Sequence, residues 1–311
     1  MPGAYAHITL VNMLREPARL DSIPAFPNEA KIALMRNFKF SELGAVSPDY
    51  PYLAITDKTA AQWADLMHYE HTGDIIIAGV RRVAAMPAGD SRNKALTWLL
   101  GYSAHVATDV TIHPIVELKV GTYAEHKKAH RICELNQDAY IFQRLNLGAI
   151  GLAEHLDAGI WACCDKPNSG HLDPVISSLW KEMLNDCHAV QYATTPPDPD
   201  RWHSGFHGVV DKIEEGGKLF PAARHLAVNS GLTYPNPDEV DPQYISNLRV
   251  PGDIGVMHYD VIFDRAINNT LNVWAAIASG MLSNSKDYLT VIDNWNLDTG
   301  RNSADKYAFW S

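Results

Sequence analysis

The chain has 311 residues, of which 46% are hydrophobic, so it can bury a sizeable core in one large domain or two ordinary ones. A disordered chain is therefore not the default expectation. The formal net charge of −10 argues against a surface built to bind nucleic-acid phosphates through clustered Lys and Arg, although bound divalent cations would make a pocket more positive. The four cysteines show neither the paired spacing of a zinc ribbon nor the density of a disulfide-rich secreted domain.

The N-terminal segment lacks a basic stretch followed by a long apolar core, and no run in the chain approaches a membrane span. We therefore expect a protein that stays in the cytoplasm by default, while export by a route that needs no signal stays open. His7 lies in this segment, and Asp49 lies in the turn-rich stretch 41–52. Each residue alone indicates little, because lone histidines are usually hydrogen-bonded bystanders and a lone loop Asp usually caps a helix or turn.

Helical periodicity dominates the rest of the chain, and alternating β-branched runs are scarce, so we predict an all-α, multi-helix fold. Apolar residues recur at helical spacing over 58–71, 93–113, 122–144, 146–162, 172–191, 205–226 and 257–281. The proline-rich segment TTPPDPD at 194–200 is the best candidate boundary. It divides the chain into a first domain over 1–192, which carries the histidine and carboxylate clusters, and a helical C-terminal extension over 193–311 that packs on it.

The predicted helix over 93–113 carries the strongest chemical signal, GYSAHVATDVTIHP, in which His105, Asp109 and His113 follow one another at four-residue intervals. Four residues advance a helix by about 40° beyond a full turn, so the three side chains project from one side. Pro114 disfavours helical geometry in the preceding residue, so we expect His113 at the very end of the helix.

The next predicted helix repeats the spacing in EHKKAHRICELNQD, where His126, His130 and Glu134 are four residues apart. A single His–Glu pair of this kind is more often a surface contact, which stabilises a helix by roughly 0.2–0.5 kcal/mol. Two such clusters close together favour a metal site instead, since imidazole nitrogen and carboxylate oxygen are ordinary zinc ligands. Cys133 lies between the two candidate ligands, and packing is the better interpretation of it.

The order of these motifs resembles the zinc-dependent phospholipase C superfamily. His7 near the N-terminus, Asp49 in a G-x-x-x-P-D loop, His68 after Trp-Ala-Asp, the H-x-x-x-D motif followed by His-Pro, and H-x-x-x-E occur in the family's order over roughly residues 2–190. The superfamily includes bacterial phospholipases C, the phospholipase D that cleaves glycosylphosphatidylinositol anchors, and single-strand-specific zinc nucleases. The last 120 or so residues add nothing to the resemblance.

The resemblance implies three zinc ions. It assigns the first to Asp49, His68, His105 and Asp109, the second to His113, His130 and Glu134, and the third to His7 and Asp109, with Asp109 as a bridge. In the family the N-terminal amine and carbonyl complete the third site, which makes Pro2 a candidate ligand after removal of Met1; the family's usual terminal Trp is absent here. His71 and His126 compete with His68 and His130, which match the motifs better.

Zinc lowers the pKa of bound water to about 7 and polarises a phosphoryl oxygen, so this ligand set fits hydrolysis of a phosphate ester by a metal-activated water. We expect Asp49 to orient or deprotonate that water. The leading hypothesis is a phospholipase C-type phosphodiesterase acting on a phospholipid head group. The alternative enzyme is a single-strand nuclease or nucleotidase that uses the same metals, although nucleic acid is the less favoured substrate. The non-catalytic alternative is a binding protein that zinc stabilises. The sequence does not indicate an oligomeric state.

Overall fold

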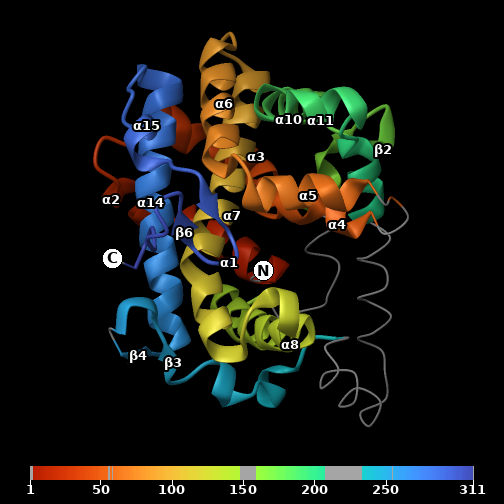
Figure 1. Cartoon of the computed structure of the whole chain (residues 1–311). Helices are drawn as coiled ribbons and strands as arrows, with labels where there is room; N and C mark the ends of the chain where they lie inside the picture. The colour runs from red at the N-terminus through yellow and green to blue at the C-terminus, as the bar shows by residue number, and fades with distance from the viewer. Residues whose placement is uncertain are drawn as a thin grey trace.

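The computed structural model describes residues 3–54, 57, 59–147, 159–206, 233–253 and 255–310, and helices make up most of them, which confirms the predicted all-α fold (Figure 1). The helices are α1 (Ala4–Leu14), α2 (Pro17–Ser22), α3 (Asn28–Val46), α4 (Tyr50–Leu53), α5 (Ala60–Tyr69), α6 (Thr72–Ala85), α7 (Asp90–Val120), α8 (Tyr123–Phe142), α10 (Pro174–Cys187), α11 (Ala189–Thr194), α14 (Tyr259–Ser283) and α15 (Tyr288–Val291). Short antiparallel pairs join β1 (Cys164–Asp165) to β2 (Asn168–Leu172), β3 (Leu248–Arg249) to β4 (Val256–Met257), and β5 (Trp295–Asn296) to β6 (Arg301–Asn302).

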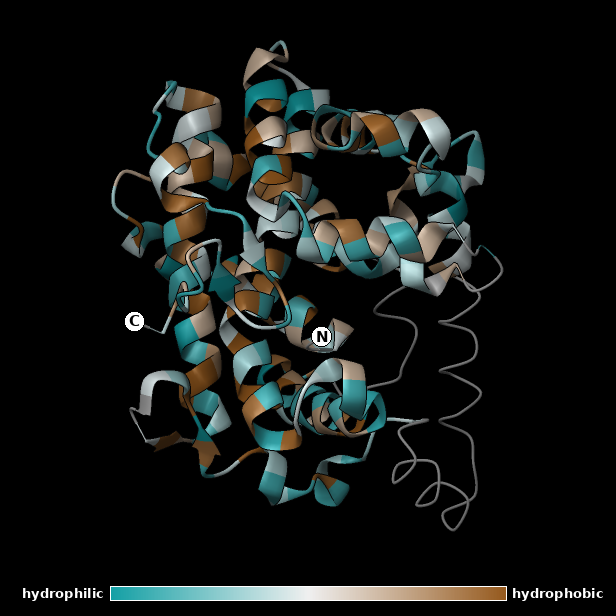
Figure 2. Cartoon of the chain, in the orientation of Figure 1, coloured by the Kyte–Doolittle hydropathy of each residue, from teal (hydrophilic) through white to brown (hydrophobic). Residues whose placement is uncertain are grey.

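Helix α7 forms the centre of the fold. It packs against α3 and α14, and α1, α6, α8 and α10 also contact it (Figure 1). Every residue from Ala95 to Val116 is buried, which is possible because most of this stretch is apolar on all sides. The outer helices differ: hydrophobic and hydrophilic residues are interleaved along α6 and α14, as expected for helices with one face on the core (Figure 2).

Two glycines let α3 and α7 approach each other backbone to backbone. A Cβ atom on Gly44 would lie 2.2 Å from the carbonyl oxygen of Trp98, and one on Gly101 would lie 2.1 Å from the carbonyl oxygen of Ser41. Larger residues do not fit at either position. This close packing brings the end of α3 beside the part of α7 that carries His105.

The expectation that α7 ends at His113 is wrong, because the helix continues through Pro114 to Val120. A proline inside a helix removes one backbone hydrogen bond and leaves a carbonyl four residues earlier without its usual donor. Here that carbonyl belongs to Val110, and it lies against Gly300, where a Cβ would be 2.5 Å from the oxygen. Burial of α7 on all sides outweighs the local cost of the proline, so His113 stays on the helix.

The predicted segments 58–71, 93–113, 122–144, 172–191 and 257–281 correspond to α5, α7, α8, α10 with α11, and α14. Most of 146–162 and of 205–226 lies outside the described residues. Helices α1, α3 and α6 were not predicted. The stretch 41–52 is also more regular than expected: α3 runs to Val46, the 3-10 turn η1 covers Ser47–Asp49, and α4 begins at Tyr50.

The C-terminal elements contact the helices that carry the histidines. Helix α14 packs along α7, and β5 contacts α5 and α6. The domain division at residues 192 and 193 stays a prediction. Among the described residues, no helix is both long enough and apolar enough to cross a membrane.

Candidate metal centre

The predicted ligands come from four helices and one 3-10 turn. Helix α1 supplies His7, the end of η1 supplies Asp49, and α5 supplies His68. Helix α7 supplies His105, Asp109 and His113, and α8 supplies His130 and Glu134. All of these residues are buried except Asp49, whose side chain is 16% exposed. Asp49 therefore lies at the open edge of the group.

Asp109 lies between imidazoles from different helices. Its Oδ1 is 3.2 Å from Nε2 of His7, and its Oδ2 is 3.1 Å from Nε2 of His105 and 3.8 Å from Nε2 of His68. The two carboxylate oxygens thus face different histidines. This geometry suits a carboxylate that bridges two cations.

Two sets of three donors lie close enough to hold a metal ion. Asp49, His68 and His105 form one set, and His7, His105 and Asp109 form the other, with the ligand atoms of each set within 4.8 Å of one another. In the first set Oδ1 of Asp49 is 3.2 Å from Nε2 of His68 and 3.9 Å from Nε2 of His105.

The remaining predicted ligands are more widely spaced. Nδ1 of His130 is 3.7 Å from Oε1 of Glu134. The negative charge of Glu134 acts to raise the pKa of His113. Within the described part of the chain, these three do not form a set as tight as the other two. Pro2, the remaining predicted ligand, lies outside the described residues.

Backbone carbonyl groups fix the orientation of most of the histidine rings. Nδ1 of His68 lies 2.7 Å from the backbone oxygen of Ala64, and Nδ1 of His105 lies 2.8 Å from that of Ala45. Nδ1 of His113 lies 2.7 Å from the backbone oxygen of Leu297. Because a carbonyl oxygen only accepts, each Nδ1 must carry a proton, so Nε2 is the nitrogen that a neutral ring offers to a metal ion. His130 has the reverse arrangement, with Nε2 2.6 Å from the Gly121 oxygen. Metal-bound histidines are usually held in this way.

The donor atoms that face the cluster have no hydrogen-bond partner among the described residues. They are both ring nitrogens of His7, Nε2 of His68, His105 and His113, Nδ1 of His130, Oδ1 of Asp49 and both oxygens of Asp109. Leaving one buried polar group without a partner costs roughly 1–3 kcal/mol, so a group of this size needs another partner. Nitrogen and oxygen lone pairs that converge in this way fit zinc.

The electrostatics of the cluster follow from burial of opposite charges. Burial lowers the pKa of His113 to about 4. Burial also disfavours the charged form of His105, but the carboxylates of Asp109 and Asp49 outweigh it and raise the pKa of His105 to about 9. Burial acts to raise the pKa of Asp109, yet the neighbouring His105 and His113 hold it well below the ordinary value. The Asp109 carboxylate is therefore ionised at neutral pH and available to a cation.

The competing histidines lie outside the cluster. His71 is exposed, and its Nδ1 is 2.8 Å from Asp74. His126 is also exposed, at a kink in α8. Cys133 is buried in the hydrophobic core, as expected for a packing residue.

No sequence motif indicated that a C-terminal segment lies beside the site. The Leu297 N–H donates to the His68 carbonyl oxygen over 3.0 Å, and the Leu297 carbonyl accepts from His113, so this residue joins α5 to α7. Oδ1 of Asp298 lies 3.5 Å from Nδ1 of His113, and its Oδ2 accepts from the Tyr69 hydroxyl. Contacts that span 184 and 229 residues leave no local sequence pattern.

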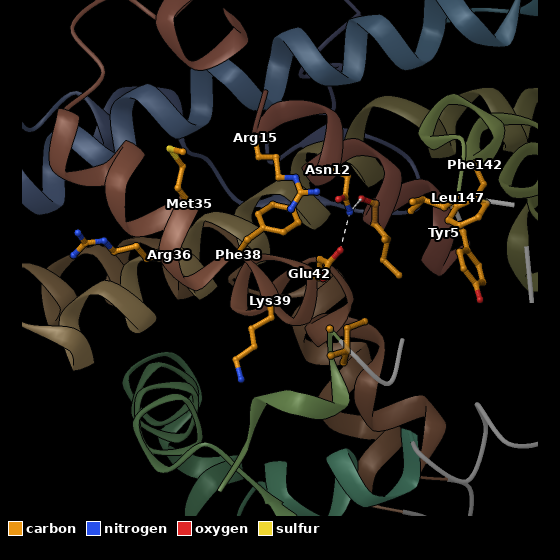
Figure 3. A pocket seen from close by; sticks show the side chains of 13 residues that line it. Tyr5, Asn12, Arg15, Met35, Arg36, Phe38, Lys39, Glu42, Phe142 and Leu147 are labelled. Carbon is orange, nitrogen blue, oxygen red and sulfur yellow. Dashed lines mark hydrogen bonds between the residues drawn. The ribbon is translucent and has the colours of Figure 1, made fainter. Parts of the chain in front are cut away.

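A separate cavity lies beside α1, and none of the proposed metal ligands lines it. A cavity of about 460 Å³ between α1 and α3 is lined by Asn12, Arg15, Phe38, Lys39 and Glu42, among others, and Asn12 donates to Glu42 over 2.7 Å (Figure 3). His7 does not line this cavity. The chemistry of the site therefore belongs to the buried cluster.

A family model described as zinc-dependent phospholipase C matches residues 6–190, which is more than half of the chain. No curated protein and no solved structure matches it. The matched range includes His7, Asp49, His68 and both four-residue clusters, and it ends before the contacts made by Leu297 and Asp298.

Proposed function

Because the chain belongs to the zinc-dependent phospholipase C family, we propose that it is a zinc-dependent phosphodiesterase that releases the phosphorylated head group of a phospholipid. The convergence of unpartnered donor atoms on Asp109 carries this proposal. Asp49, His68, His105 and Asp109 would hold one zinc ion, His113, His130 and Glu134 a second, and His7 with Asp109 a third. Bound zinc would lower the pKa of water to about 7 and withdraw charge from a phosphoryl oxygen.

The protein side chains hold the reacting groups in place. Asp49 is the most exposed of the proposed ligands, and its Oδ1 faces His68 and His105. Burial raises the pKa of Asp49, but the two imidazoles lower it more, and the net pKa lies below the ordinary value. Asp49 is therefore ionised at neutral pH, and we assign it the role of orienting the attacking water and accepting its proton.

Tyrosine rings beside the site support a lipid head group as the substrate. The Tyr52 and Tyr69 rings lie 5.7 and 6.2 Å from the His68 ring, and the Tyr123 ring lies 5.4 Å from the His130 ring. Tyr52 and Tyr123 are half-buried and Tyr69 is exposed, so all three rings have surface that a small ligand can contact. The net charge of −10 favours this substrate over a long polyanion such as nucleic acid.

The direct test uses the full chain with bound zinc on mixed micelles of detergent with phosphatidylcholine or phosphatidylethanolamine. The measured quantity is release of a water-soluble phosphorylated head group. We expect release that stops with a chelator and returns with zinc. The Asp109→Asn variant should be inactive, and the matched His126→Ala variant should match the wild type, because His126 is exposed and outside the cluster.

Two other results would overturn this assignment. Digestion of single-stranded DNA or RNA without turnover of either lipid would identify a nuclease on the same metals. Bound zinc without turnover of any phosphate ester would identify a binding protein stabilised by zinc.

A further inference from the structure

Helix α1, which carries His7, is capped by a residue from a distant helix. Its own N-cap residue is Gly3, which has no side chain to bind the first N–H groups. Asp138 on α8 takes this role: its Oδ1 accepts from the Ala6 N–H over 2.8 Å, and its Oδ2 accepts from the Tyr5 N–H over 3.2 Å. The first N–H groups of a helix lack partners within the helix, and a carboxylate there also interacts favourably with the helix dipole.

The contact between Asp138 and the start of α1 is tight. A Cβ atom on Gly3 would lie 1.9 Å from Oδ2 of Asp138, so a larger residue cannot occupy this position without displacing the carboxylate. The Tyr234 hydroxyl donates to the same oxygen over 3.3 Å, and Asp138 is fully buried. The carboxylate therefore holds the backbone of residues 5 and 6 in one place.

His7 depends on this backbone more than the other histidines do. His68, His105 and His113 each have one ring nitrogen held by a carbonyl oxygen, whereas neither ring nitrogen of His7 has a hydrogen-bond partner among the described residues. The His7 ring stacks on the His105 ring at a centroid distance of 4.0 Å. Apart from this stacking and the 3.2 Å approach of its Nε2 to Oδ1 of Asp109, the position of helix α1 sets the position of the ring.

We propose that Asp138 is a positioning residue for the metal site shared by His7 and Asp109. It holds the first turn of α1 against α8, which also carries Glu134 one turn earlier, and so keeps Nε2 of His7 beside Oδ1 of Asp109. This inference rests on the proposed zinc site and adds a residue outside the ligand set.

The test measures zinc retention, which does not depend on activity. Purified full-length protein is loaded with zinc and then incubated with a competing chelator. The number of zinc ions retained per chain is measured by elemental mass spectrometry. In Asp138→Asn we expect one class of zinc to bind about 10- to 100-fold more weakly, the usual loss when a group that positions a ligand is changed. Asp173→Asn is the matched control, because Asp173 caps α10 through the Val175 N–H and lies outside the ligand set.

A double-mutant cycle separates positioning from general destabilisation. If Asp138 acts through His7, then Asp138→Asn should cause no further zinc loss in a His7→Ala protein. Gly3→Ala disturbs the same contact, because its Cβ would displace the Asp138 carboxylate, and it should also weaken zinc retention. It keeps the proposal testable if Asp138→Asn does not fold.

Unchanged zinc affinity in Asp138→Asn and Gly3→Ala would overturn the proposal, as would an equal loss in Asp173→Asn or additive losses in the cycle. These outcomes are distinct from failure of the proposed function. A wild-type protein that binds zinc but hydrolyses no phosphate ester contradicts the activity, and the zinc affinities of the variants still decide the role of Asp138.

Discussion

Nε2 of His7 lies 3.2 Å from Oδ1 of Asp109, although the two residues are 102 positions apart in the sequence. The other oxygen of Asp109 faces His105 at 3.1 Å. One buried carboxylate therefore contacts an imidazole from the first helix of the chain and one from its central helix, and the two rings stack on each other. In the proposed enzyme this carboxylate belongs to two metal sites, so its removal affects more than one ion.

Asp109→Asn is expected to lose most bound zinc, because the amide keeps the shape of the side chain but not the charge that two cations would share. Metal content per chain, measured after dialysis against buffer without zinc, checks this. His126→Ala is the control and should keep the wild-type content. A variant Asp109→Asn with wild-type zinc content would remove Asp109 from the ligand set.

Asp49→Asn is expected to retain most of its zinc and to lose turnover by about 100-fold or more, the lower range for loss of a general base. Asp49 is the partly exposed member of the cluster, and His68, His105 and Asp109 remain to bind the ion. The measurements are kcat on the lipid substrate and zinc content of the same preparation. Unchanged kcat would exclude Asp49 from the mechanism.

Chelation is expected to lower the Tm by several degrees. Zinc at 1,000 times its Kd stabilises the folded chain by about 4 kcal/mol, and its removal leaves the buried nitrogen and oxygen atoms of the cluster without partners. Thermal unfolding with zinc and with chelator provides the comparison, and Asp109→Asn should show a much smaller difference. Identical curves for the wild type under both conditions would contradict a zinc site in this cluster.

Gly101→Ala is expected to lower the free energy of unfolding by about 1–3 kcal/mol, because its Cβ would overlap the Ser41 carbonyl and push α3 away from α7. Chemical denaturation measures the change. Gly170→Ala is the control, since a Cβ there meets nothing closer than 3.6 Å. Equal stability of the two variants would show that the α3–α7 contact adapts to the added methyl group.

Asp298→Asn is expected to weaken zinc retention by about 10-fold, because Asp298 lies beside Nδ1 of His113 and is held by the Tyr69 hydroxyl. The same chelator competition measures the effect. Asp305→Asn, in the same C-terminal segment but exposed, is the matched control. An unchanged affinity in Asp298→Asn would mean that the Leu297 carbonyl alone is sufficient to orient His113.

Local spacing in the sequence predicted part of the candidate site, because some of its proposed ligands recur at helical intervals, whereas His7, Asp49 and His68 were proposed from the family resemblance. The pairs His105 and Asp109, and His130 and Glu134, each lie on one helix, so the four-residue pattern gave their relation directly. The family was predicted from the order of five motifs, and the family match confirms it. The metal-binding roles of the individual residues stay predictions.

What the sequence did not reveal depends on tertiary packing. Pro114 predicted a helix end, but burial on all sides keeps α7 continuous. Gly44 lies within the stretch 41–52 that was predicted to be turn-rich, but it is on helix α3 and packs closely against α7. The contacts of Leu297 and Asp138 join segments more than a hundred residues apart, and neither residue belongs to a recognisable motif.

The most direct test of the metal centre is an anomalous difference map from zinc-loaded crystals, collected on either side of the zinc absorption edge. The account predicts zinc peaks on both sides of Asp109, one within bonding distance of His7 and another shared with Asp49, His68 and His105. Absence of zinc from this cluster in fully loaded crystals, or zinc bound only at other positions, would contradict it.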